Sequence, residues 1–186
     1  PSAIDADFLD RISVAPKAFL EIGAQYDAGT GLLEVEVSAD FQSAISGNYR
    51  LACVVTEDNV TGSGSGWSQS NAYAGGGNGE MGGFEVLPNP VPAAQMVYDH
   101  VARIILPSFA GQPGSFPSSV AAGEIHTMNF NIDVPAGWDI NELNIVALLL
   151  DPAGDIDNAG FATLSDAIAN GFTDAEMEVG ITETDL

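Results

Sequence analysis

The sequence is poor in positive charge. Only four of its 186 residues are Lys or Arg, against 26 acidic residues, and the formal net charge is −22. A nucleic-acid-binding surface needs clustered Lys and Arg that replace counterions on the phosphates, and an anionic membrane surface repels a chain of this charge. The composition therefore excludes nucleic acid and an anionic membrane as partners. The excess of acidic residues is explained best by solubility or by adaptation to a saline habitat.

Cysteine, histidine and long apolar runs are also scarce. Cys53 is the only cysteine, so there is no disulfide framework, and its apolar neighbours in 51–55 predict a buried, unreactive thiol. The two histidines, His100 and His126, match no zinc-ligand spacing. The longest apolar run, 145–150, has the length of a strand, whereas a membrane-spanning helix needs about 18 apolar residues. The sequence thus predicts no membrane-spanning segment.

What the sequence does contain is alternation of apolar and polar residues. Residues 33–41 and 126–134 alternate most strictly, and this period of two is typical of strands with one buried face. Residues 18–26 alternate less strictly and precede a loop with two glycines, so 18–41 is predicted to be a β-hairpin. Residues 49–57 and 143–150 are apolar on both faces, which predicts buried strands. Residues 151–155 predict a turn, after which 156–164 is expected to form a strand that pairs with 143–150.

Helical patterns are few. Residues 4–12 have apolar side chains on one side and end before Pro16, which predicts a short helix. Residues 165–171 predict another, with Ser165 as N-cap and Gly171 at the end. Residues 94–106 fit a helix or a strand, and their β-branched content favours a strand. About seven or eight strands with long loops predict an all-β fold, an antiparallel β-sandwich with the jelly roll as one variant.

These patterns divide the chain into an N-terminal arm or short helix (1–16), a β-sandwich domain (17–172) and an acidic C-terminal tail (173–186). Residues 58–92 interrupt the sandwich with many glycines and three prolines, which disfavour regular structure. The segment also carries large apolar side chains, which a disordered linker rarely contains. We therefore expect an ordered long loop folded over the sheet edge, and such loops are often functional.

This loop supplies the candidate ligand-binding residues. Trp67, Asn71 and Tyr73 combine aromatic faces with an amide, as a sugar-binding surface does, although aromatics that pin the loop to the core explain them more simply. Asp99 and His100 are adjacent, and an Asp–His pair can orient an imidazole for base catalysis. Neighbours on a strand point to opposite faces, however, which argues against this pairing.

Acidic clusters raise the question of calcium. Glu57 and Asp58 end a predicted strand, and Asp151, Asp155 and Asp157 surround a turn. Calcium takes about six to eight oxygen ligands, often from loop carboxylates. Neither cluster has the EF-hand spacing, and Asp is common in turns because its side chain bonds local N–H groups. Calcium is a secondary hypothesis, and no other cofactor is predicted.

Several stretches resemble one known family. They are YRLACVVTEDNVTG at 49–62, GSGW at 64–67, MGGFE at 81–85, LPNPVP at 87–92, MVYDHVAR at 96–103, NIVAL at 144–148 and IDNA at 156–159. Together they resemble the outer membrane protein 28 family of Bacteroidota over about residues 17–171.

The resemblance implies an extracellular protein or one associated with the outer membrane surface, with a receptor-like or adhesion-like role. Family members often carry a thioredoxin-like region upstream and a sorting signal downstream. Because the sequence contains neither, we expect an excised or processed segment. The resemblance brings no catalytic residues with it.

The sequence therefore predicts a non-catalytic binding or adhesion module for a surface glycan or protein. An alternative is a structural subunit of an extracellular filament, formed by self-association through residues 1–16. That arm has apolar side chains that need burial, on a neighbouring subunit or, as we favour, on their own domain: Ile4, Phe8, Leu9 and Ile12. A hydrolase that uses Asp99 or His100 is the least favoured function.

Overall fold

The computed structural model describes residues 2–173 and 178–181. The chain forms two compact units: Glu57–Val101, here named the loop unit, and the remainder, here named the sandwich. The helices and strands are α1 (Ser2–Ile12), β1 (Ala18–Asp27), β2 (Leu32–Phe41), β3 (Ile45–Ser46), β4 (Arg50–Glu57), β5 (Val101–Leu106), β6 (Ser119–Val120), β7 (Ile125–Asp133), β8 (Leu143–Leu150), β9 (Ile156–Thr163), α2 (Leu164–Asn170) and β10 (Glu178–Ile181). Within the described ranges, no helix has the length and apolarity needed to cross a membrane.

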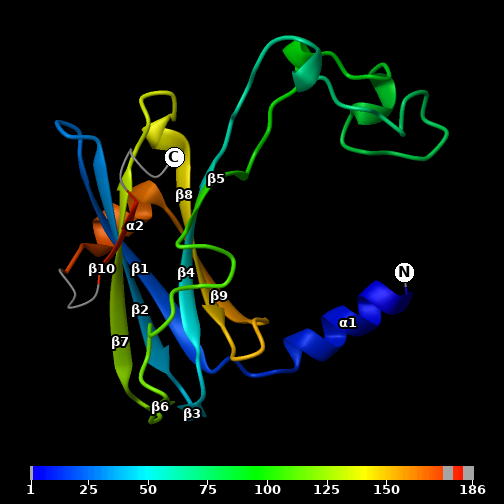
Figure 1. The fold of residues 1–186 in the computed structure, drawn as a ribbon. Helices are drawn as coiled ribbons and strands as arrows, with labels where there is room; N and C mark the ends of the chain where they lie inside the picture. The colour runs from blue at the N-terminus through cyan, green and yellow to red at the C-terminus, as the bar shows by residue number, and fades with distance from the viewer. Residues whose placement is uncertain (1, 174–177, 182–186) are drawn as a thin grey trace. The chain divides into compact units, whose positions relative to one another are not determined.

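Two four-stranded sheets make up the sandwich (Figure 1). Their strand orders are β1-β2-β7-β10 and β5-β4-β8-β9, and β3 pairs separately with β6. β2 is antiparallel to both β1 and β7, and β8 is antiparallel to β9, whereas β10 runs parallel to β7. The predicted all-β antiparallel sandwich is confirmed, and its jelly-roll variant stays a prediction.

The core lies between the two sheets because the strands alternate. In β2, Leu33, Val35 and Val37 are fully buried, while Glu34 and Glu36 on the opposite face are partly exposed. The other core strands contribute side chains of similar size, including Leu51, Val55, Met128, Phe130, Ile132, Ile145 and Leu149. Each fully buried side chain of this kind stabilises the fold by about 1.5–3 kcal/mol. Burial of the alternating face therefore fixes the register of β2.

Most strand predictions are confirmed, and two details are wrong. The hairpin 18–41 and the strands at 49–57, 126–134, 143–150 and 156–164 are present. The strand predicted at 94–106 begins only at Val101, because His100 has a left-handed backbone (φ 55°) that ends extended structure. The N-cap of α2 is Thr163 and not Ser165, since the Thr163 hydroxyl accepts a hydrogen bond from the Asp166 N–H at 3.1 Å.

The predicted N-terminal helix is confirmed, but its predicted burial on the sandwich is wrong. Four apolar side chains of α1 are 59–77% exposed: Ile4, Phe8, Leu9 and Ile12. Arg11 donates a hydrogen bond to the Ile156 carbonyl at 2.7 Å. At the other end, β10 lies within the predicted acidic tail and pairs with β7, while 174–177 and 182–186 of that tail lie outside the described residues.

The loop unit is ordered without a sheet, as the aromatic content of the sequence predicts. Two isolated bridges join its outgoing and returning chains, Val60 with Tyr98 and Gln69 with Val91, and each bridge has two backbone hydrogen bonds of 2.8–3.1 Å. The loop unit also contains three short 3-10 helices: Ser65–Trp67, Phe84–Val86 and Ala93–Gln95. The predicted position of this segment over the sheet edge stays a prediction.

Substitution of Gly23 tests the close packing of β1 against the chain that follows α2. A Cβ at Gly23 would collide with the Gly171 carbonyl oxygen, whereas a Cβ at Gly137, the matched control, meets no atom within 4 Å. We expect Gly23→Ala to lower the free energy of unfolding by about 1–3 kcal/mol through overpacking and Gly137→Ala to leave it nearly unchanged. Urea unfolding of both variants measures this, and equal stabilities would contradict the packing described.

Candidate functional site

The base of the loop unit is closed by two reciprocal hydrogen bonds. The Asn59 N–H donates to Asp99 Oδ1 at 3.0 Å, and the His100 N–H donates to Asp58 Oδ1 at 2.6 Å. Asn59 and His100 both have left-handed backbones, with φ of 56° and 55°, a conformation that costs a non-glycine residue energy unless its surroundings hold it. The aspartates therefore fix the point where the chain enters and leaves the loop unit.

Asp99 and His100, the predicted catalytic candidates, do not pair with each other at this base; His100 pairs with Asp58 instead. His100 Nδ1 lies 3.1 Å from Asp58 Oδ1, and the His100 side chain is 69% exposed. Asp99 instead accepts the Asn59 N–H. Asp99 and His100 thus both contribute to the backbone geometry of the base.

The cysteine and the second histidine of the chain, Cys53 and His126, lie in the sandwich. Cys53 is fully buried, as predicted, and burial raises the pKa of its thiol to about 12, which disfavours the reactive thiolate. His126 Nε2 lies 3.1 Å from Glu124 Oε2, and its ring meets Phe41 and Phe116 edge to face. His126 is a hydrogen-bonded residue at the edge of the core.

Asn71 organises the interior of the loop unit. Asn71 is 6% exposed, and its Nδ2 donates to the carbonyl oxygens of Phe84 at 2.6 Å and of Leu87 and Pro88 at 3.3 Å. Its Oδ1 accepts the Tyr73 N–H at 3.0 Å. An amide has two N–H groups and one oxygen, so Asn71 uses both ends within the protein. It holds two parts of the loop together, a role that differs from the predicted contact with a sugar hydroxyl.

Glu85 fixes the adjoining turn. Hydrogen bonds from the backbone N–H groups of Met81, of Glu85 itself and of Gly83 hold the pKa of this carboxyl below its usual value; the Met81 and Gly83 bonds measure 2.9 and 3.1 Å. A lowered pKa in the folded state contributes stability above the ordinary pKa, and that stability is lost as the pH falls through the folded value. The turn is therefore held by an ionised carboxylate at neutral pH.

These contacts shape an apolar concavity within the loop unit. Its volume is about 340 Å³, and its lining comprises Gln69, Ser70, Asn71, Ala72, Tyr73, Met81, Phe84, Met96 and Tyr98. Met96 is buried, whereas Met81 is half exposed. Aromatic rings and thioethers dominate the lining, and a concave surface with few polar groups is typical of a small binding site.

Of the predicted ligand residues, Asn71 and Tyr73 line this concavity, and Trp67 contacts Tyr98, which also lines it. The Trp67 ring packs on Gly62, where a Cβ would collide with the indole, and meets the Tyr98 ring at 5.9 Å. The Tyr98 hydroxyl donates to the Trp67 carbonyl at 2.9 Å. Trp67 thus positions Tyr98. Sequence reasoning missed Tyr98, Met81, Phe84 and Met96 as site residues. For Met81 and Phe84 the available signal was their size within the glycine-rich segment 58–92.

Three of the five candidate calcium residues, Asp58, Asp151 and Asp157, accept hydrogen bonds within the protein, and Asp155 is exposed. Asp151 Oδ1 accepts three backbone N–H groups from 153–155 at 2.8–2.9 Å, and Asp157 Oδ2 accepts the Lys17 N–H at 2.7 Å. Glu57 is 5% exposed. Over 2–173 and 178–181, no three His, Cys, Asp or Glu side chains are grouped so that they could hold a metal ion. Calcium stays a hypothesis without a ligand set.

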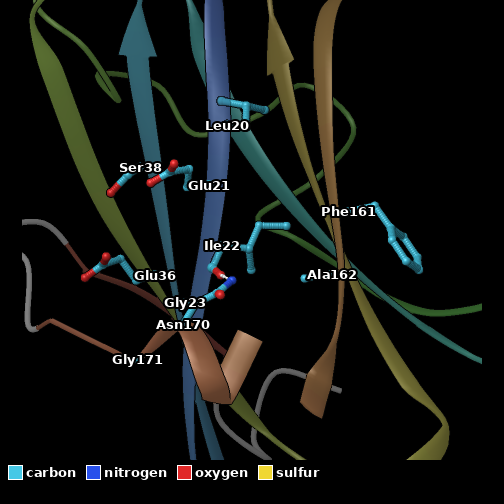
Figure 2. A pocket seen from close by; sticks show the side chains of 10 residues that line it. All are labelled: Leu20, Glu21, Ile22, Gly23, Glu36, Ser38, Phe161, Ala162, Asn170 and Gly171. Carbon is cyan, nitrogen blue, oxygen red and sulfur yellow. Dashed lines mark hydrogen bonds between the residues drawn. The ribbon is translucent and has the colours of Figure 1, made fainter. Parts of the chain in front are cut away.

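A second concavity lies on the sandwich, beside β1 (Figure 2). It measures about 410 Å³ and is lined by residues of β1, β2, β9 and α2. Figure 2 shows the Glu21 and Glu36 carboxylates on one side of β1 and the Phe161 ring pointing away from them. Glu36 Oε2 already accepts the Thr173 N–H at 2.8 Å. Because its side chains do not converge, we take the concavity of the loop unit as the candidate site.

No protein-family model, curated protein or solved structure matches this chain. The resemblance to the outer membrane protein 28 family therefore stays a hypothesis.

Replacement of Asn71 tests the order of the candidate site. Asn71→Ala removes the partner of three carbonyl groups and one N–H, so we expect the loop unit to lose about 1–3 kcal/mol of local stability. The exposed Asn78, which donates a single hydrogen bond to the Ala72 carbonyl, is the matched control. Limited proteolysis should cut Asn71→Ala within 57–101 much faster than Asn78→Ala. Equal cleavage rates would show that the amide does not organise the unit.

Proposed function

We propose that the protein is a non-catalytic binding module of the adhesion type, which acts at the cell surface or outside the cell through the loop-unit concavity. The observation that carries the proposal is that an apolar concavity is built on a segment whose own hydrogen bonds order it. Buried Asn71 and the Glu85 carboxylate hold the walls in place before a ligand arrives. A preorganised site loses less entropy on binding than a flexible one.

The proposal assigns no catalytic step, since Asp99 and His100 have roles in the base of the loop unit. Exposed apolar groups on the loop unit favour recognition, because such groups gain free energy when a partner covers them. Met81 is 50% exposed and Val86 80% exposed in this unit. The surface location is supported by the sequence resemblance and suits the acidic composition.

Binding assays on matched variants test this function. We expect the wild type to bind at least one class of probe on a glycan array and a synthetic peptide array. Met81→Ser, which removes a half-exposed apolar wall of the concavity, should weaken that binding about tenfold or more. Phe109→Ser is the control, since Phe109 is 83% exposed and belongs to the sandwich. Absence of binding to both arrays, or equal losses in both variants, would refute the proposal.

A second candidate function, a structural subunit of an extracellular filament, is favoured by α1. Its side chains Ile4, Phe8 and Ile12 are spaced four residues apart, which places them on one side of a helix, and all are exposed. A contact of this helix with a neighbouring copy would be heterologous and would form a fibre unless it closed into a ring.

Deletion of residues 1–16 tests the structural function. The net charge of −22 opposes close packing of copies, so filaments seen by electron microscopy should form more readily as salt screens the charge. They should vanish in the deletion variant and in Phe8→Ser, but persist in Asp7→Asn. A wild type that stays monomeric at every salt concentration would eliminate this function.

A further inference from the structure

We propose that the concavity of the loop unit receives an apolar side chain from a positively charged polypeptide segment. This inference rests on the proposed binding function and names the chemical class of the partner. Its two parts, the charge of the partner and its apolar anchor, come from separate features of the loop unit.

The charge of the partner follows from the composition of the loop unit. All four basic residues of the chain, Arg11, Lys17, Arg50 and Arg103, lie outside 57–101. The range 57–101 contains five acidic residues, of which Glu80 and Asp99 are exposed, Asp58 and Glu85 are half-buried and Glu57 is buried. A surface of one sign attracts partners of the opposite sign and raises their rate of association. A basic segment is thus favoured, and an acidic polysaccharide or acidic peptide is repelled.

The apolar anchor follows from the lining. Met81 and Met96 contribute thioethers, which adapt to side chains of different shapes, and Phe84 contributes an aromatic ring. A volume of about 340 Å³ is near the lower end of the range for small-ligand pockets, about 300–1,000 Å³. That space suits one or two apolar side chains better than an extended ligand.

A peptide fits the polar groups of the site better than a glycan. Asn71 is the buried amide of the lining, and its N–H groups and oxygen are already bonded within the loop unit. A sugar has hydroxyl groups on most carbons and needs several convergent polar partners, whereas an apolar side chain needs none. The exposed Gln69 and Ser70 contribute polar side chains to the lining that suit the backbone of a bound peptide.

Titration of the full chain with three synthetic peptides tests the inference. The first peptide has lysines around a leucine–phenylalanine pair, the second has glutamates in place of the lysines, and the third has serines in place of the apolar pair. We expect only the first to bind, as measured by isothermal calorimetry and by NMR shifts of loop-unit amides. Its affinity should fall about tenfold or more between about 50 and 500 mM sodium chloride, as screening increases.

Three variants assign the two parts of the interaction. Met81→Ser should weaken binding of the basic apolar peptide about tenfold or more, and Glu80→Gln, at an exposed carboxylate, about two- to fivefold. Phe109→Ser on the sandwich should bind as the wild type does. Circular dichroism and melting temperature establish that each variant is folded before its affinity is compared.

The remaining outcomes separate this inference from the proposed function. Binding to a glycan that is sensitive to Met81→Ser, with no binding of the basic apolar peptide, would overturn the inference and leave the binding function standing. Equal binding of the first and third peptides would overturn the apolar anchor. No binding of any peptide or glycan would overturn both the inference and the proposed function.

Discussion

Backbone N–H and C=O groups that leave water must find hydrogen-bond partners, and this constraint shapes both units of the protein. The sandwich meets it with strand ladders, which its alternating sequence favours. The loop unit is rich in glycine, which has no side chain to pack on a sheet, and contains prolines, which have no N–H to donate to a strand ladder. It meets the constraint with two isolated bridges, three 3-10 helices and the side chains of Asn71, Glu85 and the two basal aspartates, Asp58 and Asp99.

This difference explains why the candidate site lies where it does. In the sandwich, the apolar side chains that face the other sheet form one buried core. In the loop unit, polar side chains hold the backbone, so Tyr73, Met81 and Phe84 are left to line a concavity that is open to solvent. A stable sheet protein can carry such an excursion because its two ends, at β4 and β5, belong to the sandwich core.

The sequence predicted the sandwich well because alternation reports burial directly. Val35 and Glu34, or Val37 and Glu36, differ in hydropathy and in burial in step with the pleat, and only one register buries all the apolar members. It predicted the site poorly, because Asn71, Asp58 and Asp99 act through partners 13–42 residues away that no local pattern reveals. Likewise, the exposure of the apolar face of α1 could not be predicted. The sequence shows which side chains would be stabilised by burial, but it does not show whether another surface covers them.

The central claim is that residues 57–101 form an ordered unit that holds its concavity without a ligand. Hydrogen–deuterium exchange of the free protein, read by NMR, tests it at single amides. The account predicts slowed exchange for the bridged amides of Val60, Gln69, Val91 and Tyr98 and for Gly75, whose N–H donates to the Glu85 carbonyl at 3.0 Å. Exchange of all these amides at the rate of an unfolded chain, with β2 and β7 still protected, would contradict it.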